Sequence, residues 1–257
     1  MKPDYVDALN DIINTGYVFK SRLGDCWELR NYQVTFLAGE MFRRPGISRQ
    51  LGWAEVLQAV GGYFDRLELC AVAPKAIPSQ FDVRSCFASF GDQFEGIVDQ
   101  LRSNPETRRA LIYLDPGGTY EGMKPCATLM QFHAREGVLH SSAYQRSWDM
   151  VHGFIYDSMV YGAVTQAVAI ATGLEPGFVT ATAGSAHVYR QDFDAGKTEA
   201  TPKYGRYFHL VHPLGTSAAE FMQWAGETAT MRVNWPEGLM GRVPPGILVT
   251  KEDSQGE

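Results

Sequence analysis

A cysteine that directly follows a proline is the first candidate nucleophile in this sequence. The segment Lys124-Pro125-Cys126-Ala127-Thr128 places Cys126 between two stretches that we expect to be strands. Downstream, Arg146 stands within the run Gln145-Arg146-Ser147. An arginine near a thiol favours the thiolate, which is the nucleophilic form. A cysteine alone is more often a buried structural thiol, so the interpretation of Cys126 depends on the residues that accompany it.

Other polar residues occur in short motifs on both sides of this cysteine. Each has a simpler interpretation when it is taken singly. Two adjacent arginines after a helix are usually solvated, and a histidine two residues before a tyrosine on a strand is usually a half-buried pair. The motif residues are Arg22, Glu55, Arg108, Arg109, Asp149, Gly153, Asp157, Gly184, His187 and Tyr189.

In their order and spacing, these motifs resemble the signature of the thymidylate synthase family. The resemblance is strongest from Arg108 to Tyr189. It is weaker upstream, where Arg22 resembles the first phosphate-binding arginine and Glu55 resembles the catalytic glutamate. The resemblance implies an α/β (α+β) fold with a mixed β-sheet and helices packed on one side. It also implies a homodimer through the sheet face, with active sites shared between the subunits.

The resemblance implies a role for each motif residue. Cys126 is the expected nucleophile, and Glu55 is the expected proton-transfer residue. Asp149 and Gly153 are expected to contact the co-substrate 5,10-methylenetetrahydrofolate. His187 and Tyr189 are expected to bind the 3′-hydroxyl of a pyrimidine nucleoside monophosphate. Guanidinium groups suit phosphate oxygens, and the nucleotide-binding set is completed by Arg22, Gln145, Arg146 and Ser147, with Arg108 and Arg109 from the second subunit.

Asp157 departs from the family's pattern, because synthases that act on uridylate usually carry asparagine at this place. An amide can donate to O4 of uracil, whereas an ionised carboxylate only accepts and therefore matches the N4 amino group of cytosine. An unmatched buried polar edge costs about 1–3 kcal/mol. We interpret Asp157 as a catalytic and base-selecting residue for cytosine. The simpler alternative is that Asp157 is only the N-cap of a helix that begins near Ser158.

With aspartate at this place, the sequence most resembles the cytidylate 5-hydroxymethylases of bacteriophage DNA modification and nucleoside-antibiotic biosynthesis. The implied reaction converts CMP or dCMP, 5,10-methylenetetrahydrofolate and water to the 5-hydroxymethyl nucleotide and tetrahydrofolate. Ala127, in place of a histidine, and Leu114-Asp115, in place of Trp-Asn, would open the site to water. The alternatives are a thymidylate synthase, a uridylate hydroxymethylase, or a non-catalytic homologue that binds nucleotide or RNA. The sugar, the C5 proton acceptor and the role of His152 stay open.

Composition narrows the class of protein further. The formal net charge is −6 and no basic run stands out, which argues against a nucleic-acid partner. We expect no membrane segment, since no apolar stretch approaches the ~20 residues that a bilayer requires. Four separated cysteines without CxxC spacing indicate a reducing, cytoplasmic setting and no metal site. No repeat or linker divides the 257 residues, so we expect one domain over 1–257.

The elements that must position these residues are predicted from periodicity and from turn residues. We expect a mixed sheet, because helices and strands do not alternate as in a βαβ fold. A turn is expected at Glu136-Gly137. Predicted helices cover 5–13 with a stop at Gly16, the stretch from Ser48 to Gly61-Gly62, 94–101, and 158–173, and predicted strands cover 109–114, 128–133, 138–144 and 179–183.

Overall fold

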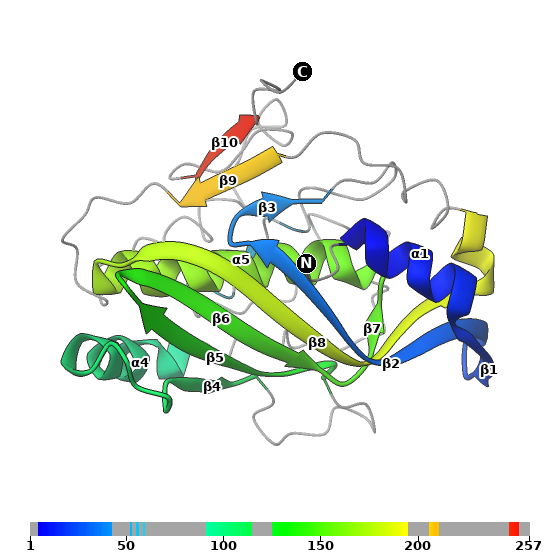
Figure 1. Ribbon diagram of the computed structural model, residues 1–257, viewed down its shortest axis with the longest axis horizontal. Helices are drawn as coiled ribbons and strands as arrows, with labels where there is room; N and C mark the ends of the chain where they lie inside the picture. Colours follow the sequence, from blue (N-terminus) through cyan, green and yellow to red (C-terminus); the bar gives the residue numbers. More distant parts are fainter. Residues whose placement is uncertain are drawn as a thin grey trace, which may run out of the picture.

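The computed structural model describes residues 5–42, 52, 55, 56, 59, 91–114, 125–194, 206–210 and 247–251. In these residues the main element is a seven-stranded sheet of order β1-β2-β8-β6-β5-β4, with β7 paired to β8 (Figure 1). Its strands are β1 (Tyr17–Ser21), β2 (Gly24–Leu37), β4 (Leu111–Tyr113), β5 (Ala127–Arg135), β6 (Val138–Gln145), β7 (Trp148–Asp149) and β8 (Glu175–Tyr189).

The sheet is mixed, as the sequence predicts. β8 lies at its centre and runs antiparallel to β2 but parallel to β6 and β7. The sharp turn between β5 and β6 is at the expected place, with left-handed backbone at Glu136 (φ 51°) and Gly137 (φ 81°). β8 extends well beyond the predicted 179–183, and this extra length carries His187 and Tyr189.

Three helices lie on one face of this sheet: α1 (Tyr5–Thr15), α4 (Gly91–Ser103) and α5 (Gly153–Thr172) (Figure 1). Leu9 and Ile12 of α1 are buried with Val34 and Phe36 of β2 in one hydrophobic core. A smaller sheet contains β3 (Glu40–Met41), β9 (Arg206–Leu210) and β10 (Ile247–Lys251). The arrangement confirms the expected fold class with helices on one side.

Helix α5 lies between the two sheets, because it contacts β6 and β8 on one side and β3 and β9 on the other. Burial on both sides explains why the helix has almost no polar face. By length and composition α5 could cross a membrane, which corrects the expectation that no stretch is apolar enough. Because most of it is buried inside the fold, it is typical of a core helix.

The start of α5 corrects a second expectation. The helix begins at Gly153, five residues before Ser158, and its N-cap position is occupied by His152. Asp157 therefore lies inside the helix and is not its N-cap. The end of the helix is as predicted: Gly173 has φ 73°, a left-handed conformation that glycine tolerates.

The second predicted helix is described at four residues. Gly52, Glu55, Val56 and Ala59 are helical, with Val56 and Ala59 buried. Its predicted limits, Ser48 and Gly61-Gly62, lie outside the described residues, as does Asp115. The β1–β2 hairpin was not predicted, because four of the five β1 residues are exposed and give no alternation of burial.

The face of the large sheet opposite the helices is covered by none of the described elements (Figure 1). Short polar contacts run along it: Thr35 Oγ1 lies 3.1 Å from Thr180 Oγ1, and Gln33 Nε2 donates to Thr182 Oγ1 at 3.1 Å. Exposed aromatic side chains, Tyr113, Tyr144 and Phe178, accompany these polar residues.

Candidate active site

Cys126 is accessible at the start of β5, and Arg146 holds its backbone from the end of β6. The Arg146 backbone N–H donates to the Cys126 carbonyl at 2.8 Å, and the Arg146 Nε–H donates to the Pro125 carbonyl at 2.8 Å. Arg146 therefore fixes the segment that carries the thiol through both its backbone and its side chain.

The charge of Arg146 acts on the thiol as the sequence predicts, but it does not dominate. Protein atoms around Cys126 raise the pKa of the thiol by desolvation, Arg146 lowers it, and Asp157 raises it. The net effect is a pKa above the ordinary value for cysteine. Arg146 therefore favours the thiolate as predicted, but in the free protein desolvation outweighs the guanidinium charge.

Asp157 projects from the first turns of α5 toward the end of β6. Its Oδ2 accepts a hydrogen bond from Gln145 Nε2 at 2.5 Å, and Gln145 Oε1 accepts one from the Tyr161 hydroxyl. The Trp148 indole N–H also lowers the pKa of Asp157, although it makes no hydrogen bond of ordinary geometry. Tyr161 and Trp148 were missed from the sequence, since aromatic residues in apolar stretches usually indicate core.

Glu55 and Asp157 form an interacting pair of carboxyl groups. Burial, followed by the charge of Asp157, raises the pKa of Glu55 to about 8. Burial and the charge of Asp149 raise the pKa of Asp157 to about 6, against the lowering effects of Gln145 and Trp148. The two groups consequently titrate on opposite sides of neutral pH, which is the arrangement by which an acid and a base are kept in one site.

Asp149 lies beside this pair at the end of β7. Its Oδ1 accepts from the backbone N–H groups of Val151 at 2.9 Å and His152 at 3.1 Å, so it orders the loop that leads into α5. Gly153 begins that helix between two carboxylates: a Cβ there would lie 3.6 Å from Asp157 Oδ2 and 3.8 Å from Asp149 Cβ. Gly153 therefore packs closely between Asp149 and Asp157, with an added Cβ at ordinary van der Waals distance from both.

His187 and Tyr189 reach the same region from β8. Their rings are in edge contact, with centroids 5.0 Å apart, and His187 stands in register with Asp149. Burial raises the pKa of the Tyr189 phenol, followed by the charges of Asp149, Cys26 and Cys126. Ser21, which precedes Arg22 in the β1–β2 turn, lowers the same pKa. These interactions bring Tyr189, Cys126 and the β1–β2 turn together.

One glycine is required by this packing. A Cβ on Gly184 would lie 2.8 Å from the Arg146 carbonyl oxygen and 2.8 Å from the Tyr144 hydroxyl. Such distances are too short for real carbon atoms, so a side chain at Gly184 would displace the backbone of Arg146.

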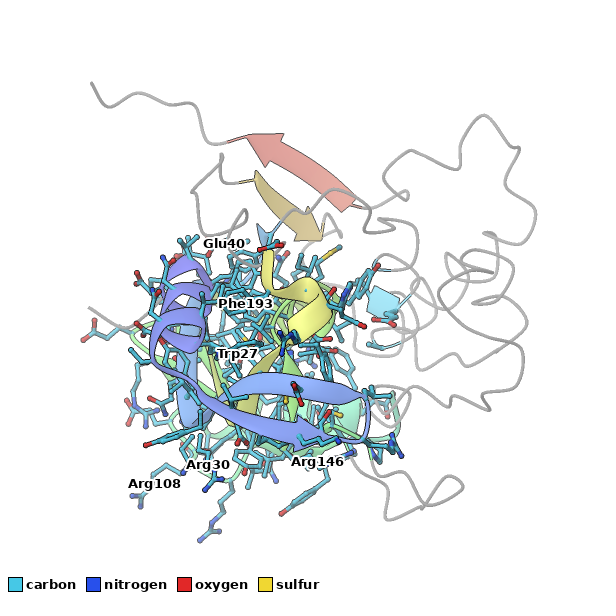
Figure 2. All side chains as sticks on the ribbon, turned by 90° about the vertical axis from the view of Figure 1, so that its right-hand side faces the viewer. Trp27, Arg30, Glu40, Arg108, Arg146 and Phe193 are labelled. Carbon is cyan, nitrogen blue, oxygen red and sulfur yellow. The ribbon has the colours of Figure 1, made fainter. Side chains whose placement is uncertain are left out.

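The pair Arg108-Arg109 lies apart from this cluster in the described chain. Arg108 and Arg109 are exposed between α4 and β4. Figure 2 shows Arg108 and Arg146 projecting at separate places along the lower edge of the molecule. Gln131, on the uncovered sheet face, donates from Nε2 to the Arg108 carbonyl at 2.8 Å. Ser147 is partly buried between β6 and β7.

The fold and the clustered motif residues agree with the class of protein that the sequence resembles. A family model described as "Thymidylate synthase" matches residues 80–210, about half of the chain. The chain belongs to the thymidylate synthase family. Among its relatives are the thymidylate synthases of varicella-zoster virus strains Dumas and Oka vaccine. Each is 36% identical over 110 residues, which make up 42% of this chain and 36% of the viral protein.

Proposed function

We propose that this chain is a folate-dependent cytidylate 5-hydroxymethyltransferase that acts on CMP or dCMP. The observation that carries the proposal is the Asp157 carboxylate, which lies inside the site within reach of Gln145 and Glu55. Because Asp157 is not an N-cap, its carboxylate is not used to satisfy the start of α5. Gln145 holds its Oδ2, and we assign its Oδ1 to accept from the N4 amino group of cytosine.

In the proposed reaction, the Cys126 sulfur adds to C6 of the pyrimidine, and C5 becomes a carbon nucleophile. 5,10-Methylenetetrahydrofolate supplies a one-carbon unit at the oxidation level of formaldehyde. A bond forms from C5 to that carbon, the C5 proton is lost, and the bond from that carbon to the folate nitrogen breaks. Water adds to the resulting exocyclic methylene, and the C6–S bond breaks to release 5-hydroxymethyl-cytidylate. No hydride is consumed, so tetrahydrofolate is the second product.

The two carboxyl groups can take different roles in this reaction, one as a proton donor and the other as a hydrogen-bond acceptor. Near pH 7, Glu55 keeps its proton, because the pKa of this group is raised to about 8. Asp157 is mostly ionised, because its pKa is about 6. Glu55 can therefore donate a proton beside the base while Asp157 accepts from the exocyclic amine. The thiol of Cys126 must lose its proton as the nucleotide binds, and a bound phosphate next to Arg146 does not favour that loss.

We assign the residues around Gly153 to the pterin and to the water that adds to the exocyclic methylene. Asp149 is held by the loop through one oxygen, and no described residue hydrogen-bonds its other oxygen. Gly153 lies between Asp149 and Asp157 and adds no side chain there. The neighbouring His152 is held by Asp192, because its Nε2 lies 3.0 Å from Asp192 Oδ1. We assign Asp149 and Gly153 to the folate and His152 to ordering water at the edge of the site.

A homodimer through the uncovered sheet face completes the proposed site. That face carries exposed aromatic and hydroxyl side chains, and Arg108 lies at its rim through the contact with Gln131. Arg108 and Arg109 do not reach Cys126 in their own chain, so we assign them to the phosphate in the partner's site. Arg22, Arg146 and Ser147 then supply the contacts from the same chain as the nucleophile.

The proposal is tested by incubating the protein and 5,10-methylenetetrahydrofolate with C5-tritiated CMP, dCMP, UMP or dUMP. The tritium released and the mass of the product are measured for each nucleotide. We expect release from a cytidylate with a hydroxymethyl gain in mass, and the better of CMP and dCMP identifies the sugar. Release only from dUMP, with a methyl gain and the absorbance of dihydrofolate, would instead establish a thymidylate synthase.

A further inference from the structure

Two residues of α5 converge on one side chain of the sheet. Asp157 and Tyr161 are four residues apart, so their side chains lie on the same face of the helix. Between them is Gln145, the last residue of β6, which is buried as Tyr161 is. Tyr161 donates its hydroxyl proton to Gln145 Oε1, and Gln145 Nε2 donates to Asp157 Oδ2 at 2.5 Å.

The two ends of this chain of hydrogen bonds require the same orientation of the amide. An ionised carboxylate can only accept, so the Gln145 NH₂ group must face Asp157. The amide oxygen is then left facing Tyr161, whose hydroxyl has a proton to donate. A reversed amide would place an oxygen against the carboxylate and the NH₂ group against the phenol.

We propose that Tyr161 is a positioning residue for base selection: it locks the Gln145 amide so that Asp157 is held as a hydrogen-bond acceptor facing the base. The inference rests on the proposed cytidylate specificity and names the hydrogen bonds that maintain it, from Tyr161 to Gln145 and from Gln145 to Asp157. With Oδ2 held by Gln145, Oδ1 of Asp157 remains for the exocyclic amine. The titratable groups that interact electrostatically with Asp157 are Glu55, Asp149 and Cys126.

The Tyr161–Gln145 hydrogen bond would orient an asparagine at position 157 as well as an aspartate. With asparagine there, the Gln145 NH₂ group would hold the asparagine oxygen, and the asparagine NH₂ group would then face the base. That arrangement matches O4 of uracil. Tyr161 therefore reinforces the preference of residue 157 in either case, and its loss lets the amides rotate.

The variant Tyr161→Phe tests this directly, because it removes the hydroxyl and keeps the ring. We expect the ratio of kcat/KM for cytidylate over uridylate to fall at least tenfold. The acid limb of the cytidylate pH profile should also move to higher pH, since Asp157 loses a donor held toward it. In the Asp157→Asn protein, Tyr161→Phe should instead lower the preference for uridylate, a reversal of sign that a loss of packing would not produce.

Thr165→Val is the matched control. Thr165 is buried one turn further along α5, with its hydroxyl 2.7 Å from Ser141 Oγ and 2.7 Å from the Tyr161 carbonyl oxygen. It should cost stability without changing base preference or the pH profile. Gln145→Met removes the same donor from Asp157 and should reproduce the Tyr161→Phe result.

The outcomes separate this inference from the proposed function. Wild-type protein that binds and turns over uridylate as well as cytidylate would overturn both. A wild-type preference for cytidylate that survives unchanged in Tyr161→Phe, with an unmoved acid limb, would overturn the lock alone. Should turnover be too slow in a variant, the ratio of Kd values for CMP and UMP on the full chain decides in the same way.

Discussion

Glu55 and Asp157 are a buried, interacting pair of carboxyl groups whose pKa values lie on opposite sides of neutral pH. Burial is the larger cause of the shift in Glu55, and the charge of Asp157 adds to it, so that the pKa of Glu55 rises to about 8. Asp157 itself titrates at about 6. Between these values the pair carries one proton and one charge, and the proton resides on Glu55.

The first prediction is a bell-shaped dependence of kcat/KM on pH with cytidylate. Activity should rise as Asp157 ionises near pH 6 and fall as Glu55 loses its proton near pH 8. In Asp157→Asn the acid limb should disappear. The basic limb should move to lower pH, because the charge that helps to raise the pKa of Glu55 is gone. A basic limb that stays in place would show that the two groups do not interact.

The second prediction concerns stability. Folded Asp157 keeps its proton to about pH 6, whereas the ordinary value for aspartate is 3.8. The folded state therefore binds more protons in this interval, and the free energy of unfolding falls as pH rises through it. Asp157→Asn has no charge to bury, so it should exceed the wild type at pH 7 by up to about 3 kcal/mol.

Urea unfolding at pH 4 and pH 7 measures this difference. At pH 4 wild-type Asp157 is protonated, and the advantage of Asp157→Asn should be nearly absent. Asp99→Asn, on the exposed face of α4, is the matched control and should differ from the wild type at neither pH. An advantage of equal size at both pH values would mean that ionisation of Asp157 is not its cause.

The sequence indicated which residues lie near one another better than it indicated the limits of the elements that hold them. The family resemblance grouped Cys126, Arg146 and Asp157, and in the structure Arg146 and Asp157 both act on the Cys126 thiol. The start of α5 was misplaced, because a helix buried between two sheets has no amphipathic period to mark its limits. Tyr161 was missed for the same reason: on a helix that is apolar on nearly all sides, only its contact with Gln145 distinguishes it from core.

The reactivity of the thiol could not be predicted from sequence either. The neighbouring arginine was visible, but desolvation of Cys126 depends on atoms from distant segments. The balance of the two effects depends on the three-dimensional surroundings of Cys126, and in the structure it raises the pKa of the thiol.

The third prediction follows from that balance. Arg146→Met removes the charge that lowers the pKa of Cys126, so the thiolate fraction near pH 8 should fall. Alkylation of Cys126 by iodoacetamide, followed by peptide mass spectrometry, should slow severalfold as the thiolate fraction falls. Arg135→Met is the control, because Arg135 also bonds a backbone carbonyl but acts on His133 rather than on Cys126. Equal rates in wild type and Arg146→Met would contradict the electrostatic role.

The fourth prediction tests the shared site. Cys126→Ser lacks the nucleophile, and Arg109→Ala lacks a phosphate contact that we assign to the partner, so each homodimer should be almost inactive. A mixed dimer contains one site with both residues intact, since Cys126 comes from one subunit and Arg109 from the other. Unfolding and refolding an equal mixture should therefore restore about a quarter of wild-type activity, because half the dimers are mixed and each has one working site. Mixing Cys126→Ser with Glu55→Gln is the control, because both losses fall in residues that we assign to the same chain. This control mixture should stay inactive, and it would recover activity only if Glu55 acts across the interface. A Cys126→Ser plus Arg109→Ala mixture that stays inactive would place Arg109 outside the partner's site.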